Sequence, residues 1–360
     1  MAAPKKKAGG ARNTALVIGG VGVIGRNLVN HLSALPDWDI VAISRRTPDF
    51  ATRAQFISVD LHDAAQAKVK LGGLTQITHI FYAGLDGGIA ASNTRRNLAL
   101  LANAVDVVEP VAKGLQRVVL MEGGKAYGRH IRGFKTPAKE SDPRHMPPNF
   151  YYDQEDYLRA LQVGKSWTWS ALRPESVLGF SVGNPLNLLN VIGVYAAISK
   201  ELGLPLVYPG SRLAYHTLMQ VTDSDLLARA QYWAATSPNA ANEAYNITNG
   251  DVFRFEQVWP RFADFFGMQV GQPLHISLVE FMADKGPLWD RIVAKYGLRP
   301  QAYADVANWE FGDFTFHTDW DLILSDGKRQ RAGFTETMDS EERFLELFQQ
   351  LRDENVIPKA

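Results

Sequence analysis

The feature that most constrains this chain is the regular alternation of short apolar segments with helical stretches in its first half. Each apolar segment is bounded by turn-forming or polar residues. Because consecutive parallel strands need a long crossover between them, the alternation predicts repeated βα units around a parallel sheet. The expected strands cover 14–18, 39–44, 55–59, 78–83, 117–121 and 167–172, and the clearest helices cover 23–34, 93–112 and 151–161.

The second half of the chain has a different pattern. Residues 184–202 predict a long helix, a stretch rich in loops and aromatic residues follows, and residues 340–354 predict an amphipathic closing helix. We therefore expect an α/β fold with a flexible tail over 1–13, a doubly wound, parallel-sheet Rossmann domain over 14–180, and a smaller mixed lobe over 181–360. The smaller lobe would bind the substrate, and some of its segments would return to the Rossmann core.

Composition limits the partners that this chain is built to meet. Lysine plus arginine and aspartate plus glutamate each number 38, so a net charge of zero gives no attraction for nucleic acid or an anionic membrane. No apolar run reaches ~18 residues, and no signal-peptide pattern follows the basic residues at the start. We expect a cytoplasmic protein whose partner is a small molecule, and a homodimer is compatible with the sequence.

Cysteine and histidine usage excludes several chemistries. The chain has no cysteine, so it has no disulfide, thiolate zinc site or cysteine nucleophile. Its 8 histidines form no H-x-x-x-H pair or H-E-x-x-H helix, which are the patterns that bind a catalytic metal. We expect no metal centre.

A glycine-rich turn joins the first expected strand to the first expected helix. Residues 15–18 run directly into Gly19-Gly-Val-Gly-Val-Ile-Gly, a G-x-x-G-x-x-G pattern. Glycine lets a pyrophosphate approach the backbone closely, and the helix N-terminus adds unpaired N–H groups and the positive end of the helix dipole. The turn predicts a dinucleotide site with contacts from Gly19, Val21, Gly22, Val23, Ile24 and Gly25.

The end of the second expected strand indicates which dinucleotide binds. Ser44, Arg45 and Arg46 stand about 20 residues after the last glycine of the turn, where an NAD enzyme carries an acidic residue for the ribose hydroxyls. Arginine instead pairs bidentately with phosphate. These three residues therefore predict a site for the 2′-phosphate, and hence NADP(H) as the cofactor.

Other strand ends complete the expected cofactor site. Asp60 and Leu61 close the third strand, where short-chain dehydrogenases place an Asp beside the adenine. Ala83 and Gly84 close the fourth strand and should flank the adenosine ribose and the pyrophosphate. The loop after the sixth strand is one that short-chain enzymes place against the nicotinamide, and it brings Val177 to the cofactor.

The Tyr-x-x-x-Lys motif of short-chain dehydrogenases is missing from this chain, because the residue four positions after Tyr151 or Tyr152 is acidic. In its place the chain carries the segment Asn149-Phe-Tyr-Tyr-Asp-Gln-Glu-Asp. An earlier segment, after the fifth expected strand, reads Glu122-Gly-Gly-Lys-Ala-Tyr-Gly. These two segments resemble the progesterone 5β-reductase/iridoid synthase family, a group of extended, atypical short-chain dehydrogenases/reductases.

The resemblance implies Lys125 and Tyr152 as the catalytic pair, with Tyr152 also touching the cofactor. Neighbouring residues on a helix point about 100° apart, so only one of Tyr151 and Tyr152 can face the nicotinamide. The family register favours Tyr152 and leaves Tyr151 to packing. Further segments extend the resemblance over nearly the full chain, at 169–181, 242–253, 285–290 and 309–313.

The resemblance also implies a reaction, in which NADPH gives a hydride to the β-carbon of an activated enone or enal. Tyr152 would stabilise the oxyanion, and Lys125 would orient the ribose and keep the phenol acidic. Carbonyl reduction or nucleotide-sugar epimerisation on the same fold are rival activities, and a non-catalytic NADP-binding sensor is a rival of another class. Plant members carry Thr and a bulky aromatic residue where this chain has the glycine-rich residues 83–88, so the width of the substrate pocket stays undefined.

Overall fold

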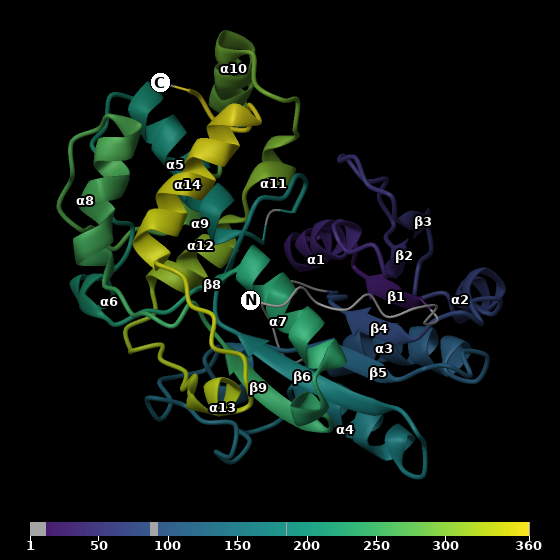
Figure 1. Cartoon of the computed structure of the whole chain (residues 1–360). Coiled ribbons are helices and arrows are strands. Elements are labelled where there is room, and N and C mark those ends of the chain that lie inside the picture. Colours follow the sequence, from purple (N-terminus) through teal and green to yellow (C-terminus); the bar gives the residue numbers. More distant parts are fainter. Residues whose placement is uncertain (1–11, 87–92, 185, 360) are drawn as a thin grey trace, which may run out of the picture.

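A computed structural model describes residues 12–86, 93–184 and 186–359 of the chain. Its centre is a sheet of seven strands, all parallel (Figure 1). The strands are β1 (Asn13–Ile18), β2 (Trp38–Ile43), β3 (Gln55–Ile57), β4 (His79–Tyr82), β5 (Arg117–Met121), β6 (Thr168–Pro174) and β9 (Glu243–Ile247). Their order across the sheet is β3-β2-β1-β4-β5-β6-β9. The predicted fold class is confirmed.

The strand order places a crevice beside β1. On one side β1 pairs with β2, up to Ile18 opposite Ile43, and on the other side it pairs with β4, up to Ile18 opposite Tyr82. The carboxyl ends of these three strands therefore lie at one level. In doubly wound sheets, ligands bind just beyond the carboxyl ends of the strands at the point where the strand order reverses. The fold alone thus directs attention to the turn that follows Ile18.

Helices cover both faces of the sheet, and this is why its central strands read as continuous apolar runs. Successive residues of a strand point to opposite faces, so Ala15 and Val17 pack under α1 and α7, whereas Leu16 and Ile18 pack under the other helices. The helices of this domain are α1 (Val23–Ser33), α2 (Ala64–Leu71), α3 (Thr94–Val108), α4 (Phe150–Gln162), α7 (Ser224–Thr236) and the short η2 (Pro238–Ala240).

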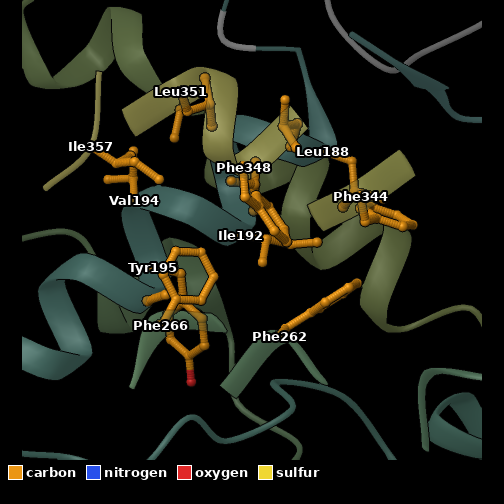
Figure 2. Packing of buried hydrophobic residues seen from close by; sticks show 14 of the residues in the cluster. Leu188, Ile192, Val194, Tyr195, Phe262, Phe266, Phe344, Phe348, Leu351 and Ile357 are labelled. Atoms are coloured by element: carbon orange, nitrogen blue, oxygen red, sulfur yellow. The ribbon is translucent and has the colours of Figure 1, made fainter. Parts of the chain in front are cut away.

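Most of the remaining helices form a lobe at the upper left of Figure 1, whereas α13 (Gly327–Arg331) lies low in that view, beside β9. The core of the lobe gathers aromatic and aliphatic side chains from three helices, as the packing of Ile192, Phe262 and Phe348 in Figure 2 shows. The centroids of the Phe262 and Phe348 rings lie 5.2 Å apart, edge to face. The elements in this part of the chain are β7 (Val177–Leu178), α5 (Leu188–Glu201), α6 (Arg212–His216), β8 (Thr222–Asp223), α8 (Phe255–Phe266), α9 (Leu278–Phe281), α10 (Gly286–Tyr296), α11 (Tyr303–Val306), α12 (Trp309–Phe316), α13 (Gly327–Arg331) and α14 (Ser340–Asp353).

The expected strands are all present, and β5 has the predicted bounds. The structure adds β9 at the sheet edge and α7 on one face, which the sequence pattern did not reveal. The predicted tail lies almost wholly outside the described residues, and Asn13, its last member, already belongs to β1. In the described part of the chain, no helix has the length and apolar character that a membrane crossing requires.

Candidate active site

A cavity of about 820 Å³ lies beyond the carboxyl ends of the parallel strands. One wall is the turn between β1 and α1, together with the residues that follow β2, β4, β5 and β6. The opposite wall comes from the helical lobe, where α12 contributes Phe311 and Phe314 and the segment before α5 contributes Leu186. The cavity is therefore shaped by both parts of the chain.

The glycine turn has the geometry that a close-lying pyrophosphate requires. Gly19 has a φ of +86°, which favours glycine. A side chain at Gly25 would come within 2.8 Å of the carbonyl carbon of Gly19, so α1 can pack against the turn only without one. The predicted contacts of this turn, Gly19, Val21, Gly22, Val23, Ile24 and Gly25, all lie on the cavity wall.

The end of β2 brings the predicted phosphate-binding residues to the same cavity. Ser44, Arg45 and Arg46 all line it, and the Arg46 N–H donates to Ser44 Oγ at 3.0 Å. The Arg46 guanidinium donates to the backbone carbonyl oxygens of Val182, at 3.1 Å, and of Gly183. Arg45 is exposed at the cavity. The two arginines thus have different surroundings, with Arg46 bridging to the loop that precedes α5.

The ends of β3 and β4 supply the remaining predicted contacts of the adenosine. Asp60, Leu61, Ala83 and Gly84 lie on the cavity wall, as does Val177 near the opposite end. The Asp60 Oδ1 accepts from the His62 N–H at 3.0 Å, which fixes the carboxylate in the turn after β3. Gly87 and Gly88, part of the glycine-rich stretch 83–88, lie outside the described residues.

Lys125 lies in the short helix η1 (Gly124–Tyr127), which follows β5 and lines the cavity. Burial, and to a smaller extent the positive charge of Arg129, lower the pKa of Lys125 to about 8. Asn149, the N-cap of α4, donates from Nδ2 to the Lys125 carbonyl oxygen at 2.8 Å. This hydrogen bond holds the start of α4 against the lysine.

The two tyrosines of α4 have different surroundings. Tyr151 lines the cavity, and its hydroxyl lies close to Gly123, where an added Cβ would be 3.3 Å from Oη. Tyr152 is absent from the wall because its hydroxyl points elsewhere. It donates to the Ala126 carbonyl oxygen at 2.7 Å and accepts from the His145 N–H at 2.7 Å. Tyr152 therefore neither faces the cofactor site nor has a hydroxyl available for a substrate.

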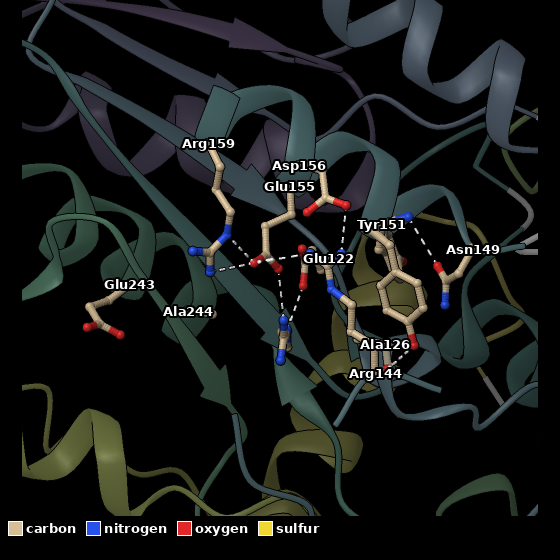
Figure 3. A network of polar contacts seen from close by, with 12 residues as sticks. Glu122, Ala126, Arg144, Asn149, Tyr151, Glu155, Asp156, Arg159, Glu243 and Ala244 are labelled. Carbon is tan, nitrogen blue, oxygen red and sulfur yellow. Dashed lines mark hydrogen bonds and ion pairs between the residues drawn. The ribbon is translucent and has the colours of Figure 1, made fainter. Parts of the chain in front are cut away.

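Helix periodicity explains why the two rings have different surroundings. Neighbours on α4 point about 100° apart, so one ring enters the cavity and the other packs against the loop before the helix. The N-terminus of α4 determines which of the two rings enters the cavity. The Tyr151 N–H there donates to Asn149 Oδ1 at 3.1 Å, and this fixes the first turn of the helix (Figure 3). Of the two tyrosines, Tyr151 and not the expected Tyr152 has its side chain at the cavity.

A buried ion pair beside Lys125 was not predicted. Arg129 Nη1 donates to Glu175 and, at 3.0 Å, to Ser176 Oγ, and the guanidinium lies 4.9 Å from the centroid of the Phe314 ring. Both charged residues are nearly inaccessible to solvent. Glu175 directly follows Pro174, the last residue of β6, and no local pattern in the sequence indicates its ion pair.

A network of charged side chains, also not predicted, runs from the cavity to the outer surface of α4. Glu122, at the end of β5, accepts from Arg173 Nε at 2.6 Å, and Arg173 Nη2 donates to Glu155 at 3.0 Å. Glu155 also accepts from Arg159 Nε at 2.7 Å, and Figure 3 shows these side chains. Burial raises the pKa of Glu122 to about 7, whereas Arg173 lowers the pKa of Glu155 against its own burial.

Proteins with a parallel sheet of this order and a glycine turn at its switch point form the Rossmann class, and two solved structures illustrate the likeness of this chain to it. A UDP-glucose 4-epimerase of Thermotoga maritima has a TM-score of 0.67 and 17% identity, covering 94% of this chain and 99% of its own. A short-chain dehydrogenase/reductase superfamily protein of Agrobacterium tumefaciens with bound NAD has a TM-score of 0.64 and 14% identity, covering 96% and 98%. At these identities the likeness shows the fold.

Sequence relatives define the family. The model of the PRISE-like Rossmann-fold domain matches residues 54–358. The (S)-8-oxocitronellyl enol synthase of Catharanthus roseus is 34% identical, over 96% of this chain and 93% of its own. A short-chain dehydrogenase of Penicillium aethiopicum is 32% identical, over 96% of this chain and 99% of its own. The chain belongs to the PRISE-like Rossmann-fold family, and the resemblance stated from its motifs is confirmed.

Proposed function

We propose that this protein is an NADPH-dependent reductase of carbon–carbon double bonds conjugated to a carbonyl group. The observation that carries the proposal is that Tyr151 and Lys125, from different elements and without a Tyr-x-x-x-Lys motif, line the same cavity. The names of its plant relatives describe synthesis of an enol. An enol is what forms when a conjugated enal gains a hydride at its β-carbon and a proton at its oxygen.

The wall residues fit an NADP molecule lying across the switch point. The glycine turn and the N-terminus of α1 would hold the pyrophosphate, and Arg45 would hold the 2′-phosphate. Asp60 and Leu61 would contact the adenine side, and Val177 would contact the nicotinamide side. Bound NADPH supplies the hydride for the reaction.

Tyr151 would act as a hydrogen-bond donor to the carbonyl oxygen of the substrate. Burial raises the pKa of Tyr151, and the charges of Glu122 and Glu175 raise it further. A phenol with a raised pKa stays protonated at neutral pH, so it can stabilise negative charge that develops on the substrate oxygen. This role differs from that of a tyrosinate, which would need a phenol with a lowered pKa. The family resemblance implied such an acidic phenol.

Lys125 would bind the cofactor and add positive charge beside the developing anion. With a pKa of about 8, its ammonium is largely protonated at neutral pH. Its position after β5, with its carbonyl oxygen hydrogen-bonded to the Asn149 cap of α4, would let it reach the cofactor ribose from a different side than the usual lysine. The Lys125 ammonium and the Tyr151 hydroxyl would thus both lie near the substrate oxygen, and the ammonium would also lie near the ribose.

The substrate side of the cavity is apolar. Phe150, Phe311, Phe314, Leu186 and Met121 line it. Such a wall accepts a hydrocarbon skeleton and leaves few polar groups to bind anything but a carbonyl. We therefore propose a hydrophobic enone or enal as the substrate.

The test is to incubate the purified protein with NADPH and a panel of enones, enals and saturated ketones, and to identify the products by mass spectrometry and NMR. Saturated carbonyl products from the conjugated substrates are expected. Alcohols as the only products would instead identify a carbonyl reductase. NADPH binding with no turnover of any panel member would contradict an enzymatic role and favour a sensor.

A further inference from the structure

Arg129 is a charged side chain on the wall of the active-site cavity, and only part of its hydrogen-bonding capacity is used. Its Nη1 atom donates to Glu175 and, at 3.0 Å, to Ser176 Oγ. Its Nε and Nη2 atoms are buried and have no partner among the residues that the structure describes. Because the side chain is only 6% exposed, bulk water does not pair with these two donors. Buried donors without a partner are unfavourable, so the two nitrogens need an acceptor.

The two free nitrogens lie on one edge of the guanidinium plane. The Nε–H bond and one N–H bond of Nη2 are parallel along this edge, and a carboxylate pairs with such an edge through both of its oxygens. Glu175 does not use this edge, because it accepts from Nη1. Arg129 therefore presents the geometry that binds a carboxylate from another molecule.

The turn after β6 fixes the guanidinium in this orientation. A single carboxylate oxygen of Glu175, Oε1, accepts from Arg129 Nη1 and, at 3.0 Å, from the Ser176 N–H. Ser176 has a φ of 31°, which is strained for a residue with a side chain. The Phe314 ring packs against the guanidinium, with 4.9 Å between the ring centroid and Cζ. The free donors are thus held in place before a ligand binds, and this favours affinity.

The charges in this part of the cavity favour an anion. Lys125 Nζ and Arg129 Cζ lie 6.0 and 4.9 Å from the centroid of the same Phe314 ring. After burial, the charge of Arg129 is the main cause that lowers the pKa of Lys125, and it outweighs the opposite effect of Glu175. Since Glu175 balances one of the two cations, one carboxylate would neutralise the other. A phosphate, with a charge of about −1.5 to −2, would exceed that balance.

We propose that Arg129 is a specificity-determining residue that binds a carboxylate of the substrate, a role that rests on the reductase function proposed above. The substrate then has a conjugated carbonyl group for Tyr151, a carboxylate for Arg129 and a hydrocarbon part that the apolar wall accepts. Because both free nitrogens are closed to solvent, a neighbouring side chain moves as the carboxylate enters. Phe314, on α12 of the helical lobe, is the contact that can move independently of the sheet domain.

The preference of the enzyme for an acid tests this role in the reaction. The substrates are linear enones that differ in the number of methylene groups between the double bond and a terminal carboxylate, each compared with its primary amide. The amide keeps the size of the group and removes its charge. At the best-fitting length the kcat/KM of the acid should exceed that of the amide about tenfold or more, as expected for hydrogen bonds to a charged group. The difference should appear mainly in KM, since the carboxylate is bound equally in the ground state and the transition state.

Arg129→Lys is the informative variant, because a lysine can still pair with Glu175 but has no edge with two parallel donors. It should lose the preference for the acid over the amide, whereas its affinity for NADPH should change little. The control is Arg132→Lys, the same substitution at an exposed arginine of the same loop, and it should keep the preference. A loss of NADPH affinity in Arg129→Lys as large as its loss of preference would place Arg129 at the cofactor and contradict the proposal.

A binding experiment without reaction separates the carboxylate site from the reductase function. Octanoate and octanamide are titrated by calorimetry into the parent protein saturated with NADP+. Octanoate should bind about tenfold more tightly or better, and this difference should vanish in Arg129→Lys and persist in Arg132→Lys. Equal affinities in the parent would show that the carboxylate site is wrong, even if the protein reduces enones. A preference for octanoate in a protein that reduces no enone would support the site and contradict the reductase function.

Discussion

At the residue scale, two adjacent tyrosines of α4 have opposite surroundings. Tyr151 lines the cavity, and no hydrogen bond to its hydroxyl is found within residues 12–86, 93–184 and 186–359. The Tyr152 hydroxyl makes two hydrogen bonds to backbone groups. This contrast provides a pair of chemically identical substitutions with different expected consequences.

Tyr151→Phe should lower turnover by about 10²–10³-fold, because it removes one donor to the developing oxyanion, while NADPH affinity and the melting temperature stay near those of the parent. Tyr152→Phe should instead destabilise the fold by about 1–3 kcal/mol, because the His145 N–H and the Ala126 carbonyl lose their partner. Steady-state kinetics and thermal unfolding measure both. A large rate loss in Tyr152→Phe with an intact fold would reverse the assignment.

Lys125 carries a cost in stability that its function would explain. Its pKa is lowered from 10.5 to about 8, first by burial. Below pH 8 the ammonium is charged in both the folded and unfolded states, so the full penalty of burying it is present. The penalty fades between about pH 8 and 10.5, where the unfolded chain binds more protons than the folded one.

Lys125→Met should therefore raise the free energy of unfolding at pH 7 by about 1–3 kcal/mol and lower both turnover and NADPH affinity. The stability gain should shrink as the pH approaches 10.5. Urea unfolding at the two pH values, together with NADPH titrations, checks this. A variant that is less stable than the parent at pH 7, or equally active, would show that Lys125 is an ordinary packed residue.

Cofactor choice belongs to the residues that follow β2. Replacing Arg45 and Arg46 together by Ala should weaken NADPH binding by about tenfold or more, because each charge-assisted contact to phosphate is worth about 1.5–3 kcal/mol. NADH, which lacks the 2′-phosphate, should lose little. Fluorescence titration gives the two affinities, and Arg291→Ala, an exposed arginine on α10, is the control. An unchanged ratio of the affinities would disprove the phosphate site.

How far the site could be predicted depends on what fixes each residue. The glycine turn and Ser44 to Arg46 follow directly from strand order, because parallel strands end at one edge, and their positions lie on the cavity wall. The choice of Tyr151 depends on the phase of α4, which the Asn149 cap determines. Glu122 and Arg129 meet their partners through tertiary contacts, and no local pattern reports those contacts.

At the scale of elements, the β1–α1 turn joins the sheet to the cofactor site. A Cβ at Gly25 would meet backbone atoms of Gly19 and Gly20, which cannot give way as a flexible side chain can. Gly25→Ala should therefore destabilise the protein by about 1–3 kcal/mol and weaken dinucleotide binding. Gly73→Ala is the control, since a Cβ there meets nothing within 4 Å. Equal NADPH affinity in both variants would contradict this account of the turn.

The sequence pattern missed β9, an edge strand with polar positions, and α7, a helix that comes from the other half of the chain. β9 is an edge strand that begins with an exposed Glu243 and contains the polar Asn246, so it lacks the apolar run of the central strands. α7 packs against α1 from the other half of the chain. The central strands were predictable because helices cover both of their faces, and this makes most of their positions apolar.

At the scale of the whole molecule, the sheet domain and the helical lobe meet around one cavity. The sheet supplies the polar groups at its carboxyl edge, and α12 of the lobe brings Phe311 and Phe314 over them. The Phe314 ring lies 6.0 Å from Lys125 Nζ, so the apolar wall reaches the charged end of the site. This arrangement fits a hydrophobic substrate whose carbonyl oxygen points to Tyr151.

The central claim is addition of hydride to the β-carbon of a conjugated carbonyl compound. It is tested most directly by the fate of deuterium from NADPH that carries the label at both C4 positions. After incubation with a reactive enone or enal, NMR of the product should show deuterium on the β-carbon of a saturated carbonyl compound. Deuterium on the carbinol carbon of an unsaturated alcohol would contradict the account and identify the protein as a carbonyl reductase.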